Sequence, residues 1–149
     1  MNTLSMRAAF AAVFLALACT ATQAADANIT LQDAHARIVF GAKVGAAYLR
    51  VTNGSTEPDR LVVVSTPMAS KAELHSVIDD NGVMKMRLVE GIALKPGETV
   101  ELKPGGLHVM LMDIQPGLKP GDTIPLTLTF EKAGVKSVSA SVDKPAHGH

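Results

Sequence analysis

The chain has 149 residues with 14 basic and 14 acidic side chains, so its formal net charge is zero with histidine neutral. Nucleic-acid binding and attachment to an anionic membrane surface both favour a positive surplus, and this chain has none. The length fits one domain with a hydrophobic core and leaves little room for two.

The first 24 residues follow the three-part pattern of a secretory signal peptide. Basic Arg7 precedes an uncharged apolar run from Ala8 to Ala18, and small and polar residues continue to Ala24. The run is too short to span a bilayer, and no later segment approaches the required length. We therefore expect removal of residues 1–24 on export to the periplasm, which leaves a soluble mature chain without a membrane span.

The single cysteine, Cys19, lies inside this leader, so the mature domain would contain no thiol and no disulfide. Cys19 could also be the lipidated residue of a lipoprotein cleavage box. The large aliphatic residue usually found three places before such a cysteine is Ala16 here, which disfavours lipid anchoring.

From residue 29 onward, short segments with β-branched residues alternate with turn signals, and no stretch has sustained helical periodicity. Many short strands at this spacing are typical of an all-β antiparallel sandwich or barrel. The predicted strands cover 29–40, 46–52, 60–66, 72–78, 83–90, 99–103, 107–114, 123–131 and 135–142.

Turn signals support this interpretation and define the domain at 25–142. Asn81-Gly82 predicts a tight hairpin between the segments 72–78 and 83–90, because Asn-Gly can supply the two positive φ angles of a type I′ turn. Several Pro-Gly turns follow in the second half of the chain. The final segment, 143–149, has no apolar content to bury, so we expect a flexible tail there.

Four side chains with soft-metal donor atoms, His75, Met86, His108 and Met110, are spaced by ten, twenty-one and one intervening residues. Thioethers are neutral and soft, so they bind well only to polarizable ions such as Cu(I). In a strand, residues two apart share a face, so His108 and Met110 can converge on one ion. The hairpin would bring Met86 near His75, and Glu73 is a candidate to orient that imidazole. The set predicts a Cu(I) site.

The other methionines are more ambiguous. Flexible thioether side chains usually fill gaps in a core, which is the expected role of Met68, Met84 and Met112. Met84 and Met112 nevertheless lie one strand period from Met86 and Met110, so substitution of one donor by its neighbour stays open.

The tail ends in a His-x-His pair, His147 and His149. Two imidazoles can hold Cu(II) or Zn(II), which makes this pair a possible secondary metal site. The tail is short and lacks methionine, so a plain solvated terminus is the alternative.

At the four donors the chain resembles the periplasmic copper chaperones of the PCu(A)C type. Their signature is His, ten residues, Met, twenty-one residues, then His-x-Met, and it is matched without insertion or deletion. One departure is Ser76, where the family often has Met. The likeness extends through 45–49 (Gly-Ala-Ala-Tyr-Leu), Asn53, 72–75 (Ala-Glu-Leu-His), 83–86 (Val-Met-Lys-Met), 102–106 (Leu-Lys-Pro-Gly-Gly), 108–112 (His-Val-Met-Leu-Met) and 125–130 (Pro-Leu-Thr-Leu-Thr-Phe).

The resemblance implies a cupredoxin-like Greek-key β-sandwich or barrel that binds Cu(I). It also implies delivery of copper for the binuclear copper centre of cytochrome c oxidase, with an oxidase subunit or another assembly chaperone as the partner. We expect a monomer.

Other function classes fit less well. A blue-copper electron-transfer centre needs a cysteine thiolate, which the mature chain would lack. No nucleophile elbow, zinc helix or phosphate-binding glycine loop is present, so we expect no enzyme activity. Two alternatives stay open: a periplasmic copper-buffering or resistance protein without a dedicated acceptor, and a structural β-sandwich that binds no metal.

Overall fold

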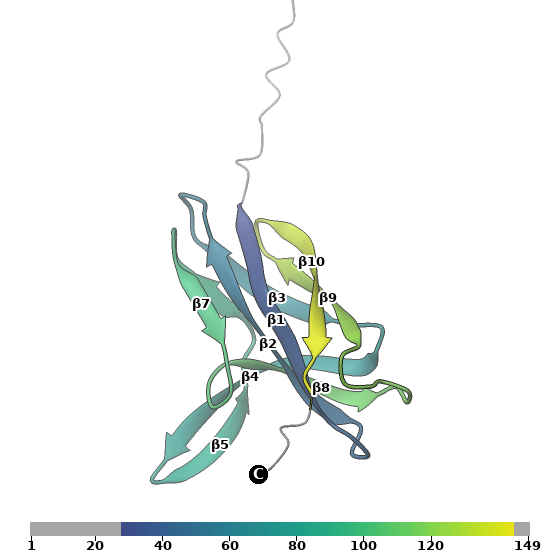
Figure 1. Cartoon of the computed structure of the whole chain (residues 1–149). Coiled ribbons are helices and arrows are strands. Elements are labelled where there is room, and N and C mark those ends of the chain that lie inside the picture. The colour runs from purple at the N-terminus through teal and green to yellow at the C-terminus, as the bar shows by residue number, and fades with distance from the viewer. Residues whose placement is uncertain (1–27, 145–149) are drawn as a thin grey trace, which may run out of the picture.

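The computed structural model describes residues 28–144, and all regular structure in that range is β (Figure 1). The expected leader and the tail histidines His147 and His149 lie outside the described residues. Between residues 28 and 144, no helix is long and apolar enough to cross a membrane. The strands are β1 (Ile29–Val39), β2 (Val44–Asn53), β3 (Asp59–Ser65), β4 (Ala69–Asp80), β5 (Val83–Leu88), β6 (Ile92–Leu94), β7 (Thr99–Leu102), β8 (His108–Ile114), β9 (Thr123–Phe130) and β10 (Gly134–Val142).

The strands form one hydrogen-bonded path in the order β5-β4-β8-β2-β1-β10-β9-β3-β6, with β7 attached to β2. All strand pairs are antiparallel except β1 and β10, which run parallel. The two ends of the path, β5 and β6, do not pair, but β3 contacts β4. The sheet therefore curls back on itself around its core and stays open at its edges.

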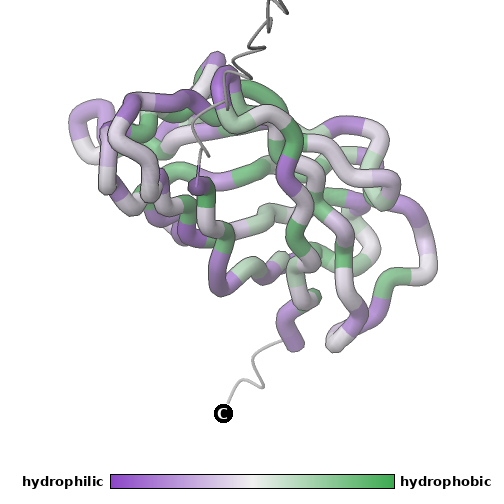
Figure 2. Tube along the Cα trace, turned by 90° about the horizontal axis from the view of Figure 1, so that it is seen from above, coloured by the Kyte–Doolittle hydropathy of each residue, from purple (hydrophilic) through white to green (hydrophobic). Residues whose placement is uncertain are grey.

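The core follows the two-residue period of the strands. In β9, four side chains are almost completely buried and alternate with more accessible neighbours: Ile124, Leu126, Leu128 and Phe130. Figure 2 shows the same mixture of apolar and polar residues along the curled trace. Burying one such aliphatic or aromatic side chain stabilises the fold by roughly 1.5–3 kcal/mol. The all-β expectation is confirmed, and the sequence missed only β6, whose three residues are too few for a visible alternation.

Two buried polar side chains tie loops to this core. The Asn53 amide donates to the carbonyls of Glu57 and Leu94, and its oxygen accepts from Ser55. The Asp59 carboxylate accepts from the backbone N–H groups of Lys132 and of the next residue, both in the β9–β10 turn. Because their polar atoms are paired, these side chains are stabilising despite their burial.

The hairpin between β4 and β5 forms at the predicted turn. Asn81 and Gly82 have φ angles of 54° and 83°, as a type I′ turn requires. β5 is an edge strand, and all of its residues are exposed. The hairpin projects from the body of the molecule at the lower left of Figure 1.

Candidate metal centre

His75 and His108 are direct partners across the antiparallel pair of β4 and β8. Their ring centroids lie 5.8 Å apart, with the ring planes at 54°. His108 is 5% exposed and the His75 side chain 16% exposed. Their strand neighbours Leu74 and Val109 belong to the hydrophobic core, so the two imidazoles share the opposite face of the sheet.

Met110 and Met86 flank this pair on the same face. Met110 follows His108 by two residues on β8 and lies opposite Glu73 of β4. Met86 of β5 lies opposite Val77, two residues beyond His75 in the other direction along β4. The register thus brings all four sequence-predicted donors onto one face of the three strands β5, β4 and β8.

The same register distinguishes these methionines from their neighbours. Met84 lies opposite Asp79 and Met112 opposite Lys71, so each is one strand period farther from the histidine pair than Met86 or Met110. Only Met68 packs against the core as expected. The core role predicted for Met84 is wrong, because it is 62% exposed on the edge strand. The same prediction is wrong for Met112, which is half-buried on the donor face and outside the core cluster.

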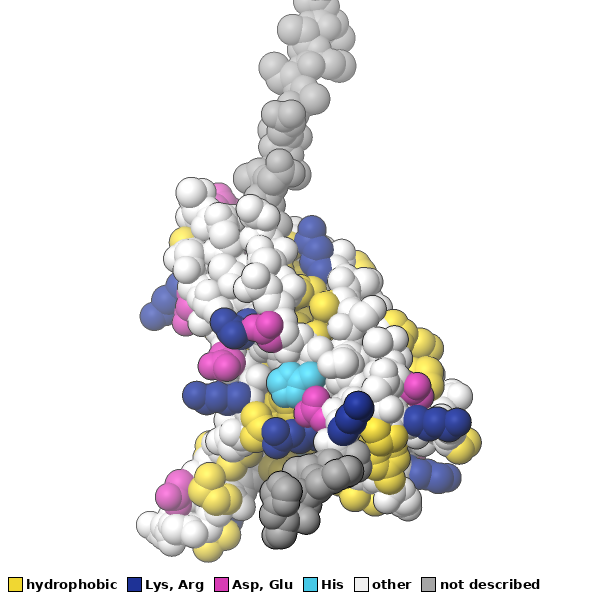
Figure 3. All heavy atoms as spheres, viewed as in Figure 1, with side chains coloured by type: hydrophobic (Ala, Val, Ile, Leu, Met, Phe, Trp, Pro, Cys, Tyr) yellow, Lys and Arg dark blue, Asp and Glu magenta, His cyan; other side chains and the backbone are white. Residues whose placement is uncertain are grey.

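Met86 differs from the other three donors in its exposure. It is 61% exposed, whereas Met110 is half-buried between two neighbouring strands. Figure 3 shows hydrophobic side chains gathered on the projecting hairpin, where Met84 and Leu88, on the same face as Met86, are also more than half exposed. One edge of the donor face is therefore apolar and open to solvent.

Each histidine has one ring nitrogen committed to a hydrogen bond. His108 donates from Nδ1 to the Gly106 carbonyl oxygen at 3.0 Å. His75 donates from Nε2 to Glu73 Oε2, also at 3.0 Å, which agrees with the orienting role considered for Glu73. His75 Nδ1 is buried without a hydrogen-bond partner among the described residues. A buried nitrogen without a partner is costly unless something else binds it.

Glu73 is held from both sides. Lys71 Nζ lies 2.6 Å from Glu73 Oε1, while His75 contacts the other oxygen. The hydrogen bonds from Lys71, first, and from His75 lower the pKa of the Glu73 carboxyl, because both partners favour its charged form. Glu73 is therefore a carboxylate at neutral pH.

Without the thioethers, the usual metal-binding side chains do not make a site here. Within residues 28–144, no group of three or more His, Cys, Asp or Glu side chains could hold a metal ion. A metal centre at the histidine pair thus depends on the thioethers, which favour a soft ion.

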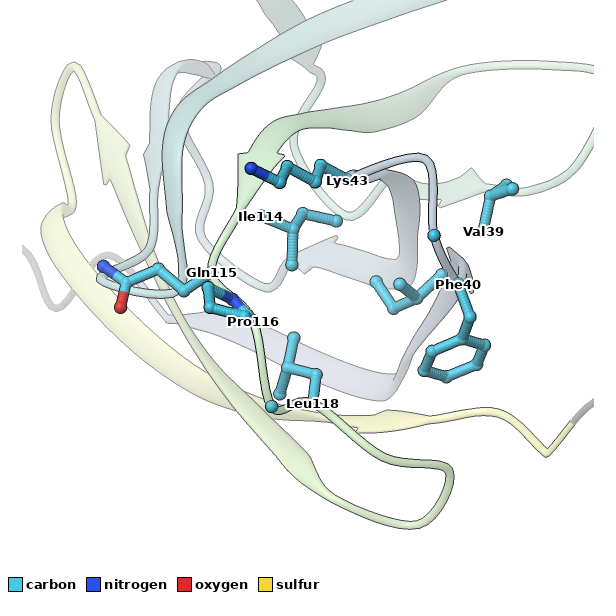
Figure 4. A pocket seen from close by; sticks show the side chains of 10 residues that line it. Val39, Phe40, Lys43, Ile114, Gln115, Pro116 and Leu118 are labelled. Carbon is cyan, nitrogen blue, oxygen red and sulfur yellow. The ribbon is translucent and has the colours of Figure 1, made fainter.

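A separate cavity of about 210 Å³ lies near the other end of β8 and carries no donor of this kind (Figure 4). It is formed by the turn between β1 and β2 and by the loop after β8, with Phe40, Ile114 and Leu118 among its walls. Among the described residues that line it, Lys43 carries the only charged side chain.

Residues 29–142 match the family model described as "Putative lipoprotein LpqE-like". The chain belongs to the LpqE-like family. This LpqE-like protein is 31% identical over 103 residues to Lxx21020 of Leifsonia xyli subsp. xyli, a match that covers 68% of this chain and 62% of that relative. The LpqE-like chain thus spans less than two thirds of the length of the relatives it matches.

Solved structures similar to this LpqE-like protein include PCuAC domains. The copper-bound PCuAC domain from PmoF2 is 30% identical with a TM-score of 0.67, over 78% of this chain and 93% of that one. Cu(I)-bound DR1885 from Deinococcus radiodurans is 32% identical with a TM-score of 0.57, over 87% and 89%. The PCu(A)C resemblance and the cupredoxin-like β-sandwich are confirmed.

Proposed function

We propose that this LpqE-like protein is an exported metallochaperone that binds Cu(I) through His75, Met86, His108 and Met110. The observation that carries the proposal is the pairing of His75 with His108 on one face, with a thioether on each side. The similar PmoF2 domain and DR1885 have structures with copper and Cu(I), respectively, which supports the choice of ion.

The donor chemistry suits a transported ion. Two imidazoles and two thioethers carry no negative charge, so they favour singly charged, soft Cu(I) over Zn(II) or Cu(II). A site without thiolate avoids cysteine oxidation in an oxidising compartment. His75 Nδ1 is buried without a partner among the described residues, and a bound ion would supply one.

The exposure of the donors suggests how the ion leaves. Met86 is the most accessible of the four and stands on an edge strand. We infer that an incoming donor of an acceptor protein replaces the Met86 thioether first, while the better covered His108 holds the ion. Such ligand exchange is binding and release without turnover, so no enzyme activity is proposed.

The proposed function also includes export to the periplasm and a protein that accepts the copper. The leader pattern of residues 1–24 supports a periplasmic protein, and the lipoprotein description of the family supports testing Cys19 for lipidation. The proposed acceptor is a copper-receiving protein, with the binuclear copper centre of cytochrome c oxidase as the target that the PCu(A)C resemblance implies. We propose a monomer, with Cu(II) at His147 and His149 as a secondary site.

The copper site is tested by competition between the purified, reduced protein and a Cu(I) chelator. We expect one tight Cu(I) equivalent in the wild type and its loss in the variant carrying both His108→Ala and Met110→Ala. His35→Ala is the matched control, because His35 lies on β1, which β2 separates from β8, and its Nδ1 contacts the Asp33 carbonyl oxygen. Equal Cu(I) affinity in the wild type and the double variant would refute the site.

Delivery is tested in cells and separates a chaperone from a copper buffer. Loss of the gene should reduce copper loading of the oxidase under copper scarcity. Normal loading together with increased sensitivity to excess copper would instead indicate buffering.

A further inference from the structure

We propose that Glu73 is a positioning residue that holds the His75 imidazole with Nδ1 turned toward the ion, so that the two histidines bind Cu(I) through different nitrogens. His75 would use Nδ1 and His108 would use Nε2. This inference rests on the proposed Cu(I) site and assigns its atoms.

The assignment for His75 follows from its hydrogen bond. A carboxylate only accepts hydrogen bonds, so the 3.0 Å contact with Glu73 Oε2 puts the imidazole proton on Nε2. The lone pair of the neutral ring then lies on Nδ1. That nitrogen is buried and has no partner among the described residues. It is the atom of His75 that is free to bind a metal.

The assignment for His108 is the reverse. Its Nδ1 contacts the Gly106 carbonyl oxygen, which also only accepts, so the proton of the neutral ring lies on Nδ1. The lone pair therefore lies on Nε2. Metal-binding histidines commonly donate their other ring N–H to a carboxylate or to a backbone carbonyl, and here each imidazole has one of these two partners.

Lys71 holds the Glu73 carboxylate in the orientation that this role requires. The two Glu73 oxygens are divided between partners, with Oε1 toward Lys71 at 2.6 Å and Oε2 toward His75. The carboxylate is therefore fixed in orientation as well as in charge. Its negative charge makes the His75 imidazole a stronger donor without adding an anionic ligand to the ion.

The test combines nitrogen NMR of the metal-free protein with Cu(I) titration. In the ¹⁵N-labelled protein at a pH where both histidines are neutral, we expect an unprotonated Nδ1 on His75 and an unprotonated Nε2 on His108. On addition of Cu(I), these two resonances should be the ring-nitrogen signals that move most.

Two Glu73 variants separate the effect of the hydrogen-bond acceptor from the effect of the negative charge. Glu73→Leu removes the acceptor and should abolish the tautomer preference of His75, with about 10–100-fold weaker Cu(I) binding. Glu73→Gln keeps an acceptor oxygen and should retain the tautomer with a smaller loss of affinity. Glu131→Leu is the matched control for folding and affinity, because Glu131 is exposed and lies in the turn between β9 and β10.

Three results would overturn the inference: a proton on His75 Nδ1 in the metal-free protein, a Cu(I)-induced shift at His75 Nε2 in place of Nδ1, or unchanged tautomer and affinity in Glu73→Leu. The proposed function fails separately. If the wild type binds no Cu(I), the metallochaperone proposal is refuted whatever the tautomer is. If Cu(I) binds through His75 Nε2, the site survives and only the role of Glu73 is refuted.

Discussion

His75 and His108 stand directly opposite each other on neighbouring strands, with ring centroids 5.8 Å apart. They are remote in sequence, and only the antiparallel pairing of β4 with β8 makes them neighbours. Since cross-strand partners share a face, this pairing also places Met110 beside them, while the pairing of β4 with β5 places Met86.

The register predicts unequal roles for the methionines of β5. Met86→Leu should weaken Cu(I) binding about tenfold or more, which corresponds to a loss of at least about 1.4 kcal/mol in binding free energy. Met84→Leu should leave the affinity unchanged, because Met84 lies one strand period farther from His75. Both substitutions conserve volume and affect exposed positions, so the fold should tolerate them. Chelator competition measures the difference, and equal losses would contradict the assignment of Met86.

Lys71 predicts a measurable change in the titration of Glu73. Lys71→Met should raise the pKa of the Glu73 carboxyl, because the Lys71 hydrogen bond is the largest cause of its lowering. Carbon NMR of the side-chain carboxyl in the metal-free protein reports this pKa directly. An unchanged value would show that Lys71 does not hold Glu73 in solution.

The same interaction has a defined effect on stability. A carboxyl with a lowered folded-state pKa contributes stability above its unfolded-state pKa, and this contribution is lost as the pH falls through the folded value. The wild type should therefore be more stable than Lys71→Met at neutral pH, and the two should converge at acidic pH. Urea unfolding at several pH values measures the difference in stability between the two proteins. A difference that stays constant with pH would contradict the prediction.

Gly45 is required where β2 approaches β1. A Cβ added at Gly45 would lie 2.6 Å from Ile38 Cδ1 and 2.7 Å from the Arg37 carbonyl oxygen. Because the second atom belongs to the backbone, the strands must shift, and Gly45→Ala should lower the unfolding free energy by about 1–3 kcal/mol. Gly106→Ala is the control, since its added Cβ would meet nothing closer than 3.6 Å. Denaturant unfolding compares the two, and equal stabilities would contradict the crowding at Gly45.

Loss of the Asp59 carboxylate should also lower the stability of the fold, here through lost hydrogen bonds. Its carboxylate accepts hydrogen bonds from the backbone N–H groups of Lys132 and Ala133, and Asp59 is 7% exposed. Asp59→Ala leaves these donors without their acceptor and should destabilise the fold by about 2 kcal/mol or more. Glu131→Ala at the neighbouring exposed position should change stability by less than about 0.5 kcal/mol. Thermal unfolding measures the stability of both variants. A loss of stability in Asp59→Ala no larger than that in Glu131→Ala would refute this role of Asp59.

Local patterns anticipated most of the fold. The two-residue alternation of β9 and the Asn81-Gly82 turn depend on interactions between near neighbours in the chain, so they are readable without tertiary structure. The parallel pairing of β1 with β10 was not readable, because it joins the two ends of the domain. β6 was missed because its few residues pair with a strand distant in sequence.

For the candidate site, the sequence alone determined the donor types and their spacing, and these were enough to indicate a soft ion. It left open whether Met84 or Met112 replaces Met86 or Met110, because residues one strand period apart have the same face and chemistry. Only the tertiary structure decided which of them lie nearer to the histidines, and which nitrogen of His75 has no partner among the described residues. The first depends on cross-strand register, which long-range packing sets for β4 and β8. The second depends on the burial and the ring orientation of His75 beside Glu73, which no sequence pattern encodes.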